Sequence, residues 1–332
     1  MKVLLLGGTG NISTACVEHA LASGHEVAIL NRGQRPSPFG SRVKTISGER
    51  GDTALLRRSA ETEGFDAVVD FLAYRPEQVE AATLAFGSHI GQYVFISSAS
   101  VYERPLVHYV VTEETPRANP FWEYARQKIA CEERLLAAYR QQGFPLTIVR
   151  PSYTYGPSWI PSGFGGQDYT VVDRIRRGLP IVCHGDGTAL WTMTASSDFA
   201  VGLVGLLGRK DALGESFHIT SDEVLTWDGV YRAIGRAAGR EPELVHVPSD
   251  LIAALYPERG GSLLGDKASS AVFDNAKIKR FVPEFKTRML FADGMARSVA
   301  WFDADPERRT VSEKANAMID RVIAAQRRAL GG

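Results

Sequence analysis

The first half of the chain alternates short apolar runs with longer amphipathic segments. The apolar runs are rich in valine, isoleucine and leucine, which favours β-strands. They fall at residues 3–6, 26–30, 43–46, 67–71, 92–97 and 146–150. Helical spacing predicts helices between them, at residues 14–23, 53–63, 76–87 and 122–142. This alternation predicts an α/β fold, with a doubly wound parallel sheet covered by helices on both faces.

The pattern changes after residue 157. Residues 158–168 are rich in glycine and aromatic residues, which predicts a loop. Helical spacing returns at residues 198–208, 226–238, 249–255, 291–302 and 306–330, and Thr226 is the predicted N-cap of the second helix. We therefore expect two domains, residues 1–157 and a smaller one over residues 158–332, with a segment near 188–225 returning to the first.

Composition and charge exclude several classes of function. The 332 residues carry 38 Lys+Arg against 38 Asp+Glu, and zero net charge disfavours a nucleic-acid-binding surface. No apolar run approaches the roughly 20 residues that span a bilayer. The apolar stretch at the N-terminus is also too short for a signal peptide. We expect a cytoplasmic protein with a small-molecule substrate and with neither a nucleic-acid nor a membrane partner.

The three cysteines, Cys16, Cys131 and Cys183, are odd in number and show no C-x-x-C spacing. They predict neither a disulfide framework nor a metal site. Cys131 and Cys183 are interpreted as small buried apolar side chains.

A glycine-rich turn follows the first predicted strand. Gly7, Gly8 and Gly10 stand between that strand and a helix, and Asn11 and Ile12 complete the turn. Glycines here let backbone N–H groups approach a pyrophosphate at a helix N-terminus. We therefore expect a dinucleotide cofactor. Ser13 stands where a third glycine is usual, so the packing of helix on strand is expected to be slightly looser.

The end of the second strand bears on which dinucleotide binds. A carboxylate there would accept from the ribose 2′-hydroxyl of NAD, but the sequence has Asn31, Arg32 and Arg35. Two guanidinium groups favour the 2′-phosphate of NADP. NAD stays the alternative if Arg32 only stacks on the adenine. Further candidate contacts of the cofactor are Glu49, Arg50, Leu72, Ala73, Ser97 and Pro151.

Tyr124 and Lys128 provide a candidate acid/base group. Their i,i+4 spacing in a helical segment places the phenol and the ammonium on one face. A neighbouring ammonium and the positively charged nicotinamide of a bound cofactor both favour the phenolate, so we expect the pKa of Tyr124 to fall from about 10 toward neutral. A simple pair on a helix surface is the alternative. Ser98, at the end of a strand, adds a hydroxyl that can bind the reacting oxygen.

These motifs together resemble one family. Gly7 and Gly10, Ser98-x-x-x-Tyr102, Tyr124-x-x-x-Lys128 and residues 150–157 are similar to the extended short-chain dehydrogenase/reductases, the NAD-dependent epimerase/dehydratase family. The resemblance implies that Ser98, Tyr124 and Lys128 are the catalytic triad, and that Gly7, Gly10 and Ile12 line the pyrophosphate. It also implies a Rossmann domain over residues 1–157 and a substrate-binding domain after it.

Departures from the family pattern narrow the reaction. Ala99 and Ser100 stand where the 4,6-dehydratases of the family carry Asp-Glu, and Ser100 stands where some epimerase-reductases carry a cysteine. Nucleotide-sugar enzymes place an arginine four residues after the Gly-Asp-Gly that ends at residue 187, and this chain has Trp191. A second phosphate-binding arginine is also missing before Gly265, with Arg259 as a displaced substitute. The substrate therefore need not be a nucleotide sugar.

Four residues are candidate substrate contacts: Ser100, Tyr153, His184 and Trp191. Alternatives stay open for two of them, since His184 can be a structural or rim histidine and Trp191 can fill the core. The loop over residues 159–169 is either a lid on the substrate or a plain surface connection.

The favoured function is an NAD(P)-dependent oxidoreductase or epimerase that acts on a secondary alcohol of a sugar or sugar-like substrate. The alternatives are an NADPH-dependent reductase of a non-sugar carbonyl, and a non-catalytic NADP(H) sensor or RNA-binding relative that resembles chloroplast stem-loop binding proteins. In the family, helices equivalent to 76–87 and 122–142 pair across a dimer. We expect a homodimer, because small residues there permit close packing: Ala81, Ala82, Ala130, Ala137 and Ala138.

Overall fold

The computed structural model describes residues 1–34, 37–87 and 89–331. Within these residues, seven parallel strands form the central sheet in the order β12-β7-β5-β4-β1-β2-β3. The strands are β1 (Lys2–Leu6), β2 (Glu26–Asn31), β3 (Lys44–Ser47), β4 (Ala67–Asp70), β5 (Gln92–Ile96), β7 (Leu146–Pro151) and β12 (Ser216–Ile219). The predicted doubly wound parallel sheet is confirmed, and all six predicted strands belong to it.

Alternate side chains of each strand enter two different cores. Val3 and Leu5 of β1 pack in one core with α1 (Ser13–Ala22) and α6 (Ser196–Gly205). Leu4 and Leu6 point to the other face of the sheet. Three helices cover that second face: α2 (Thr53–Glu63), α3 (Pro76–Phe86) and α4 (Glu123–Gln142). The near-continuous apolar strands in the sequence reflect this burial on both sides.

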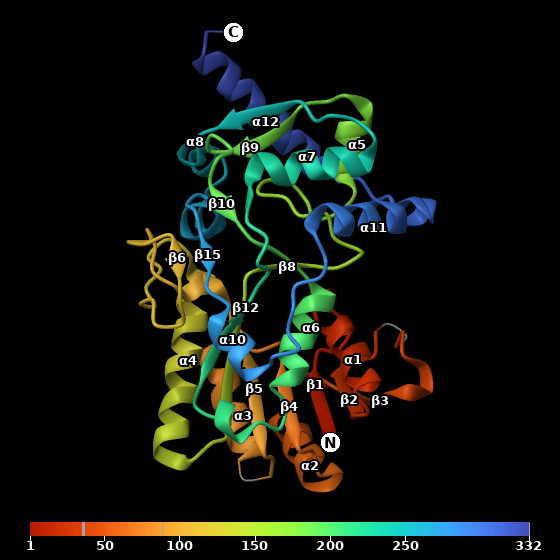
Figure 1. Cartoon of the computed structure of the whole chain (residues 1–332), viewed down its shortest axis with the longest axis vertical. Helices are drawn as coiled ribbons and strands as arrows, with labels where there is room; N and C mark the ends of the chain where they lie inside the picture. The colour runs from red at the N-terminus through yellow and green to blue at the C-terminus, as the bar shows by residue number, and fades with distance from the viewer. Residues whose placement is uncertain (35–36, 88, 332) are drawn as a thin grey trace.

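A second region lies over the carboxyl ends of the strands (Figure 1). Its principal core gathers α5 (Thr170–Arg177), α7 (Trp227–Ala238) and α11 (Phe291–Asp303). Another core joins α8 (Ser249–Leu255) and α12 (Glu313–Ala329). The smaller elements are β6 (Val110–Val111), β8 (Tyr153–Tyr155), β9 (Ile181–His184), β10 (Leu190–Trp191), β11 (Met193–Ala195), β13 (Leu225–Thr226), β14 (Leu244–Val247), β15 (Val272–Phe273), α9 (Pro257–Ser262) and α10 (Ala276–Phe281).

Most predicted helices are confirmed, but the last differs, and three helices of the described residues were missed: α5, α9 and α10. The Thr226 hydroxyl caps α7 by accepting from the backbone N–H of Gly229, at 3.0 Å. The helix predicted at 306–330 begins only at residue 313, because the Ser312 hydroxyl accepts from the Ala315 N–H and caps it there. Helix α5 was missed because its short, charged sequence reads as surface. Its Arg174 is buried by distant partners, Asn316 and Asp320 of α12.

In the described part of the chain, no helix is long and apolar enough to cross a bilayer. The edge at which the parallel strands end faces the second region, so side chains from both regions meet there (Figure 1). The division into domains at residue 157 stays a prediction, although β12 pairs with β7 and thus returns a later segment to the sheet.

Candidate active site

The turn between β1 and α1 needs glycine at two positions. Gly7 has φ +93°, and a Cβ there would lie 2.7 Å from Cγ of Leu72. A Cβ on Gly8 would overlap Cγ2 of Ile29. The Ser13 hydroxyl donates to the Gly7 carbonyl at 2.6 Å and accepts from the Gly10 N–H at 2.8 Å. The serine that replaces the usual third glycine therefore braces the turn.

A cavity of about 710 Å³ opens beside this turn. It is lined by the ends of four neighbouring strands, β4, β1, β2 and β3, and by the segments that follow them. Seven of the predicted cofactor contacts line it: Gly7, Gly10, Asn31, Arg32, Glu49, Arg50 and Leu72. Asn31 Oδ1 accepts from the Gly33 N–H at 2.9 Å, which fixes the end of β2 without a carboxylate. Arg35 lies outside the described residues.

Arg50 supports the fit of a dinucleotide to this cavity. Its Nη2 lies 2.6 Å from Oδ2 of the buried Asp70, which also accepts from the Tyr93 hydroxyl at 2.7 Å. Within the described residues, Nη1 of Arg50 is buried with no hydrogen-bond partner. An orphaned donor of this kind calls for an acceptor that the chain does not supply. Oxygen atoms of a bound nucleotide would satisfy it.

The remaining cofactor candidates lie elsewhere. Ile12 and Pro151 line the neighbouring smaller cavity, and Nδ2 of Asn11 donates to the Thr154 carbonyl at 3.0 Å. Ala73 and Ser97 are buried and line neither cavity. The Ala73 carbonyl accepts a hydrogen bond from Lys128. Ala73 and Ser97 therefore lie in the interior beside the site and not in the walls of its cavities.

The smaller cavity, of about 260 Å³, holds the candidate catalytic groups. Ser98 and Tyr124 both line it. Ser98 follows β5 and caps a single helical turn, where its Oγ accepts from the Ser100 N–H at 3.2 Å and the Ser100 hydroxyl at 2.9 Å. Ser100 therefore orients the Ser98 hydroxyl, which keeps one proton to donate to a substrate oxygen.

Lys128 lies one helical turn after Tyr124 and is buried. Its Nζ donates to the carbonyls of Ala73, at 2.7 Å, and Ile96, at 2.8 Å. It also lies 5.8 Å from the centre of the Tyr124 ring. Hydrogen bonds to the last residue of β5 and to the segment after β4 thus hold the ammonium at the carboxyl edge of the sheet.

Burial dominates the proton affinities of this pair. It lowers the pKa of Lys128 to about 8, although the Asp70 carboxylate opposes the shift. It raises the pKa of Tyr124 above its ordinary value, and a hydrogen bond with Ser98 offsets only part of that rise. The expected fall in the pKa of Tyr124 is therefore wrong for the protein alone. The phenol is protonated and suited to give a proton to a carbonyl oxygen.

The predicted substrate contacts divide into two pairs. Ser100 and Tyr153 line the smaller cavity. His184 and Trp191 do not, because both are buried in the core of the second region, where each packs on Trp227. Nε2 of His184 lies 3.1 Å from the Lys267 carbonyl, and burial lowers the pKa of this histidine to about 4. Neither residue is therefore a substrate contact. His184 is a structural histidine and Trp191 fills the core, which are the alternatives that the sequence left open.

Several residues of the cavity wall were not predicted to belong to the site: Trp122, Asp266 and Lys267. Their segments meet only in the folded chain, and no local motif marks them. The loop over residues 159–169 is not a plain surface connection, because its Ile160 and Phe164 are buried while Trp159 and Gln167 line the cavity. Its role as a lid stays a prediction.

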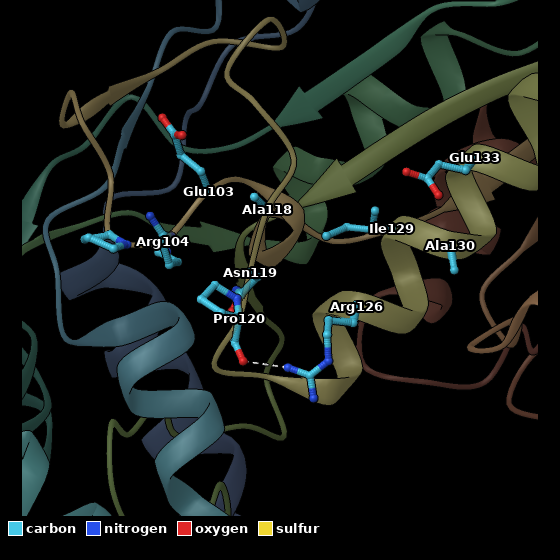
Figure 2. A pocket seen from close by; sticks show the side chains of 10 residues that line it. Glu103, Arg104, Ala118, Asn119, Pro120, Arg126, Ile129, Ala130 and Glu133 are labelled. Carbon is cyan, nitrogen blue, oxygen red and sulfur yellow. Dashed lines mark hydrogen bonds between the residues drawn. The ribbon is translucent and has the colours of Figure 1, made fainter.

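A further cavity, of about 660 Å³, lies on the outer side of α4 and contains none of the predicted site residues. Figure 2 shows Arg126 among the residues that line it, donating a hydrogen bond to the Pro120 carbonyl, at 2.7 Å. Arg104 lines it and is buried, with Nη2 3.8 Å from a carboxylate oxygen of Asp266. Arg104 thus lies between this cavity and the Asp266 wall of the smaller one.

Comparison with known proteins agrees with this geometry. A family model described as the NAD dependent epimerase/dehydratase family matches residues 3–220. The chain belongs to this family. The family predicted from the sequence motifs is therefore confirmed.

Two curated relatives and one solved structure illustrate the range of the family. The chain is 28% identical to 2′-dehydrokanamycin reductase of Streptomyces kanamyceticus, over 87% of this chain and 81% of that protein. It is 28% identical to the chloroplast stem-loop binding protein of 41 kDa b from Arabidopsis thaliana, over 74% of this chain and 65% of the relative. The crystal structure of dTDP-glucose 4,6-dehydratase from Bacillus anthracis in complex with NAD is 19% identical and has a TM-score of 0.74, covering 92% of this chain and 98% of that one. This likeness shows the fold.

Proposed function

We propose that the protein is an NAD(P)-dependent oxidoreductase or epimerase that acts on a secondary alcohol, or its ketone, in a sugar or sugar-like substrate. The observation that carries this proposal is the meeting of Ser98 and Tyr124 in one cavity, with Lys128 fixed behind them. The glycine turn and the larger cavity lie alongside, and they supply the dinucleotide site that such chemistry needs.

The chemistry divides among these side chains. The dinucleotide, when bound, takes or returns the hydride. Tyr124 gives a proton to the carbonyl oxygen during reduction, or removes the hydroxyl proton during oxidation. Ser98 donates a hydrogen bond to the same oxygen and thereby holds it against the phenol. Lys128 favours the phenolate that forms in the oxidation direction, since its ammonium lies close to the ring.

The walls of the smaller cavity support a sugar-like ring as the substrate. Trp122, Trp159 and Tyr153 give it flat apolar surfaces, and Gln167 adds an amide for hydroxyl groups. Its volume of about 260 Å³ suits a single sugar-like ring better than a nucleoside diphosphate. In the described part of the chain, no arginine lines it. The similarity to 2′-dehydrokanamycin reductase supports a sugar ketone outside the nucleotide-sugar class.

We propose NADP as the preferred cofactor. The end of β2 offers Asn31 and Arg32 to the larger cavity, where a carboxylate would repel a 2′-phosphate. Tyr74 and Gln78 of the α3 region complete the opposite wall.

A homodimer through α3 and α4 is a further proposal. Ala81, Ala130 and Ala137 are partly exposed on these helices, and Leu84 is 70% exposed. Ala82 and Ala138 belong instead to the core under the sheet, so they cannot form the contact.

Reduction of a panel of ketosugars with 4-deuterated NADPH tests the proposed function. We expect deuterium at one carbinol carbon of a product, with incorporation reduced at least about 100-fold in Tyr124→Phe. An epimerase would instead interconvert its substrate and the epimer of that substrate, with no net consumption of NADPH. Dinucleotide binding without transfer to any member of the panel, together with retention of RNA, would favour the RNA-binding alternative. The similarity to the stem-loop binding protein keeps that alternative open.

A further inference from the structure

Cys183, Asp228 and His246 bring a thiol, a carboxylate and an imidazole together outside the cavities described above. Cys183 lies on β9 and His246 on β14, and the pairing of these strands sets the two residues opposite each other. Asp228 lies in the first turn of α7. Its Oδ1 is 2.7 Å from Nε2 of His246 and 3.6 Å from Sγ of Cys183. The three donor atoms lie within 4.8 Å of one another.

Gly187 makes this convergence possible. Its φ is +77°, and a Cβ there would overlap Oδ1 of Asp228 and lie 2.8 Å from Nε2 of His246. The Gly187 carbonyl also accepts from the Asp228 N–H, at 3.0 Å. The Gly-Asp-Gly turn therefore packs directly on the cluster. It leaves no room for a side chain between Gly187 and the side chains of Asp228 and His246.

The charges around the cluster favour a cation. Asp186 interacts with both Cys183 and His246, and Asp228 adds a second carboxylate. Arg232 opposes them, but it binds the other oxygen of Asp228, at 3.3 Å, and it also lies 3.5 Å from Glu241. A partner on the far oxygen orients a ligating carboxylate, as outer-shell groups do in metal sites.

The cluster is open on one side. The side chains of His246 and Asp228 are 39% and 20% exposed, whereas Cys183 is fully buried behind them. An ion that arrives from solvent meets the imidazole and the carboxylate first and reaches the thiol last. Water can fill the remaining position.

We propose that Cys183, Asp228 and His246 form a binding site for a zinc-type divalent cation, with water as the fourth ligand. A thiolate, an imidazole nitrogen and a carboxylate oxygen are the donors that Zn²⁺ takes in tetrahedral sites. Binding releases the thiol proton of Cys183 to solvent and uses the neutral imidazole of His246. The prediction of no metal site rested on the absence of a C-x-x-C motif, and these ligands are 45 and 18 residues apart in the chain.

The proposed role of the ion is to tie β9, β14 and α7 together. Cys183 is followed by His184, whose ring contacts the carbonyl of Lys267 in the wall of the smaller cavity. The ion would therefore stiffen one side of that cavity without touching the substrate.

Titration of the metal-free full-length protein with CoCl₂ tests the proposal, since a cobalt–thiolate bond gives a near-ultraviolet charge-transfer band. We expect the band to saturate at one Co²⁺ per chain, to disappear on addition of ZnCl₂, and to be absent from Cys183→Ser. Cys16→Ser and Cys131→Ser are matched controls, because those cysteines are also buried but lie elsewhere. They should keep the band.

His246→Gln decides the matter if Cys183→Ser fails to fold, because His246 is at the surface. Loss of an outer-shell partner already weakens metal binding about 10- to 100-fold, so loss of this ligand should weaken Zn²⁺ binding at least about tenfold in calorimetry. The proposal is overturned if the wild type shows no thiolate band, if Cys183→Ser retains it, or if His246→Gln binds Zn²⁺ as tightly as the wild type. None of these readouts depends on catalytic activity.

Discussion

The two main cavities are built in different ways. The larger one is lined by residues 7–78 alone, at the ends of adjacent strands and in the loops that follow them. The smaller one draws its walls from segments that are far apart in the chain, from Ile12 through Ser98 and Tyr124 to Lys267. Backbone geometry shapes the first cavity and side chains shape the second.

This difference assigns separate tasks to the two cavities. A turn with positive φ at Gly7 and close contact at Gly8 leaves little freedom for substitution, which suits a cofactor that many enzymes share. The aromatic and charged walls of the smaller cavity can change one side chain at a time, which suits selection among substrates. Variants of the first should therefore affect dinucleotide binding, and variants of the second should affect catalysis or substrate choice.

The largest expected effect comes from Tyr124→Phe. Loss of the phenol proton should lower kcat about 10²- to 10⁴-fold, the usual contribution of general acid–base catalysis. Dinucleotide affinity, measured by fluorescence titration, should stay within about twofold because the larger cavity is unchanged. Tyr109→Phe is the matched control and should retain the activity, because Tyr109 is exposed and lines neither cavity. Equal losses in the two variants would contradict the assignment of Tyr124.

Gly7→Ala should weaken dinucleotide binding in the larger cavity. The new Cβ meets Leu72 at 2.7 Å, so we expect dinucleotide affinity to fall at least about tenfold in calorimetry. Gly24→Ala is the matched control. It has a similar φ, +78°, but nothing lies within 4 Å of its Cβ, so it should cost stability alone. If both variants bind the dinucleotide like the wild type, the turn does not hold the pyrophosphate.

Asn31→Asp should shift the cofactor preference. A carboxylate at the end of β2 repels a 2′-phosphate and accepts from a ribose hydroxyl, and bonds to charged groups are worth about 1.5–3 kcal/mol. We expect the ratio of NADP to NAD affinity to fall about tenfold or more. The control is Arg57→Ala, which removes a charge on the exposed part of α2. An unchanged ratio in Asn31→Asp would refute the proposed preference for NADP.

The smallest expected effect is that of Lys128 on how the free energy of unfolding changes with pH. Its pKa is about 8 in the folded protein and ordinarily 10.5, so between these values the unfolded chain binds more protons at this position. The free energy of unfolding of the wild type, minus that of Lys128→Met, should rise with pH by up to about 1.4 kcal/mol per unit. Urea unfolding of the dinucleotide-free proteins from pH 8 to 10 measures this slope, and a flat difference would contradict the shifted pKa.

Sequence reasoning succeeded where local pattern determines structure. The six strands, the Thr226 cap and the glycine turn follow from apolar runs and turn chemistry within a few residues. It failed where burial depends on distant partners. Arg174 lies in a charged segment that suggests the surface until α12 covers it. The sequence left His184 between a substrate contact and a structural histidine, and only its packing against Trp227 and Lys267 decides for the structural role.

The same contrast between local pattern and distant partners explains which residues of the candidate site were predicted from the sequence. Ser98, Tyr124 and Lys128 were found because each has a fixed spacing within its own strand or helix. Asp266 and Lys267 were missed because they reach the cavity through the packing of a single helical turn. Their contribution is a property of the tertiary structure.

Native mass spectrometry of the purified protein with NADP⁺ and with NAD⁺ tests whether the larger cavity holds a dinucleotide for chemistry at Tyr124. We expect one dinucleotide per chain, with NADP⁺ retained at lower concentrations than NAD⁺ and both lost in Gly7→Ala. A wild-type protein that retains neither dinucleotide would show that the larger cavity does not hold the cofactor.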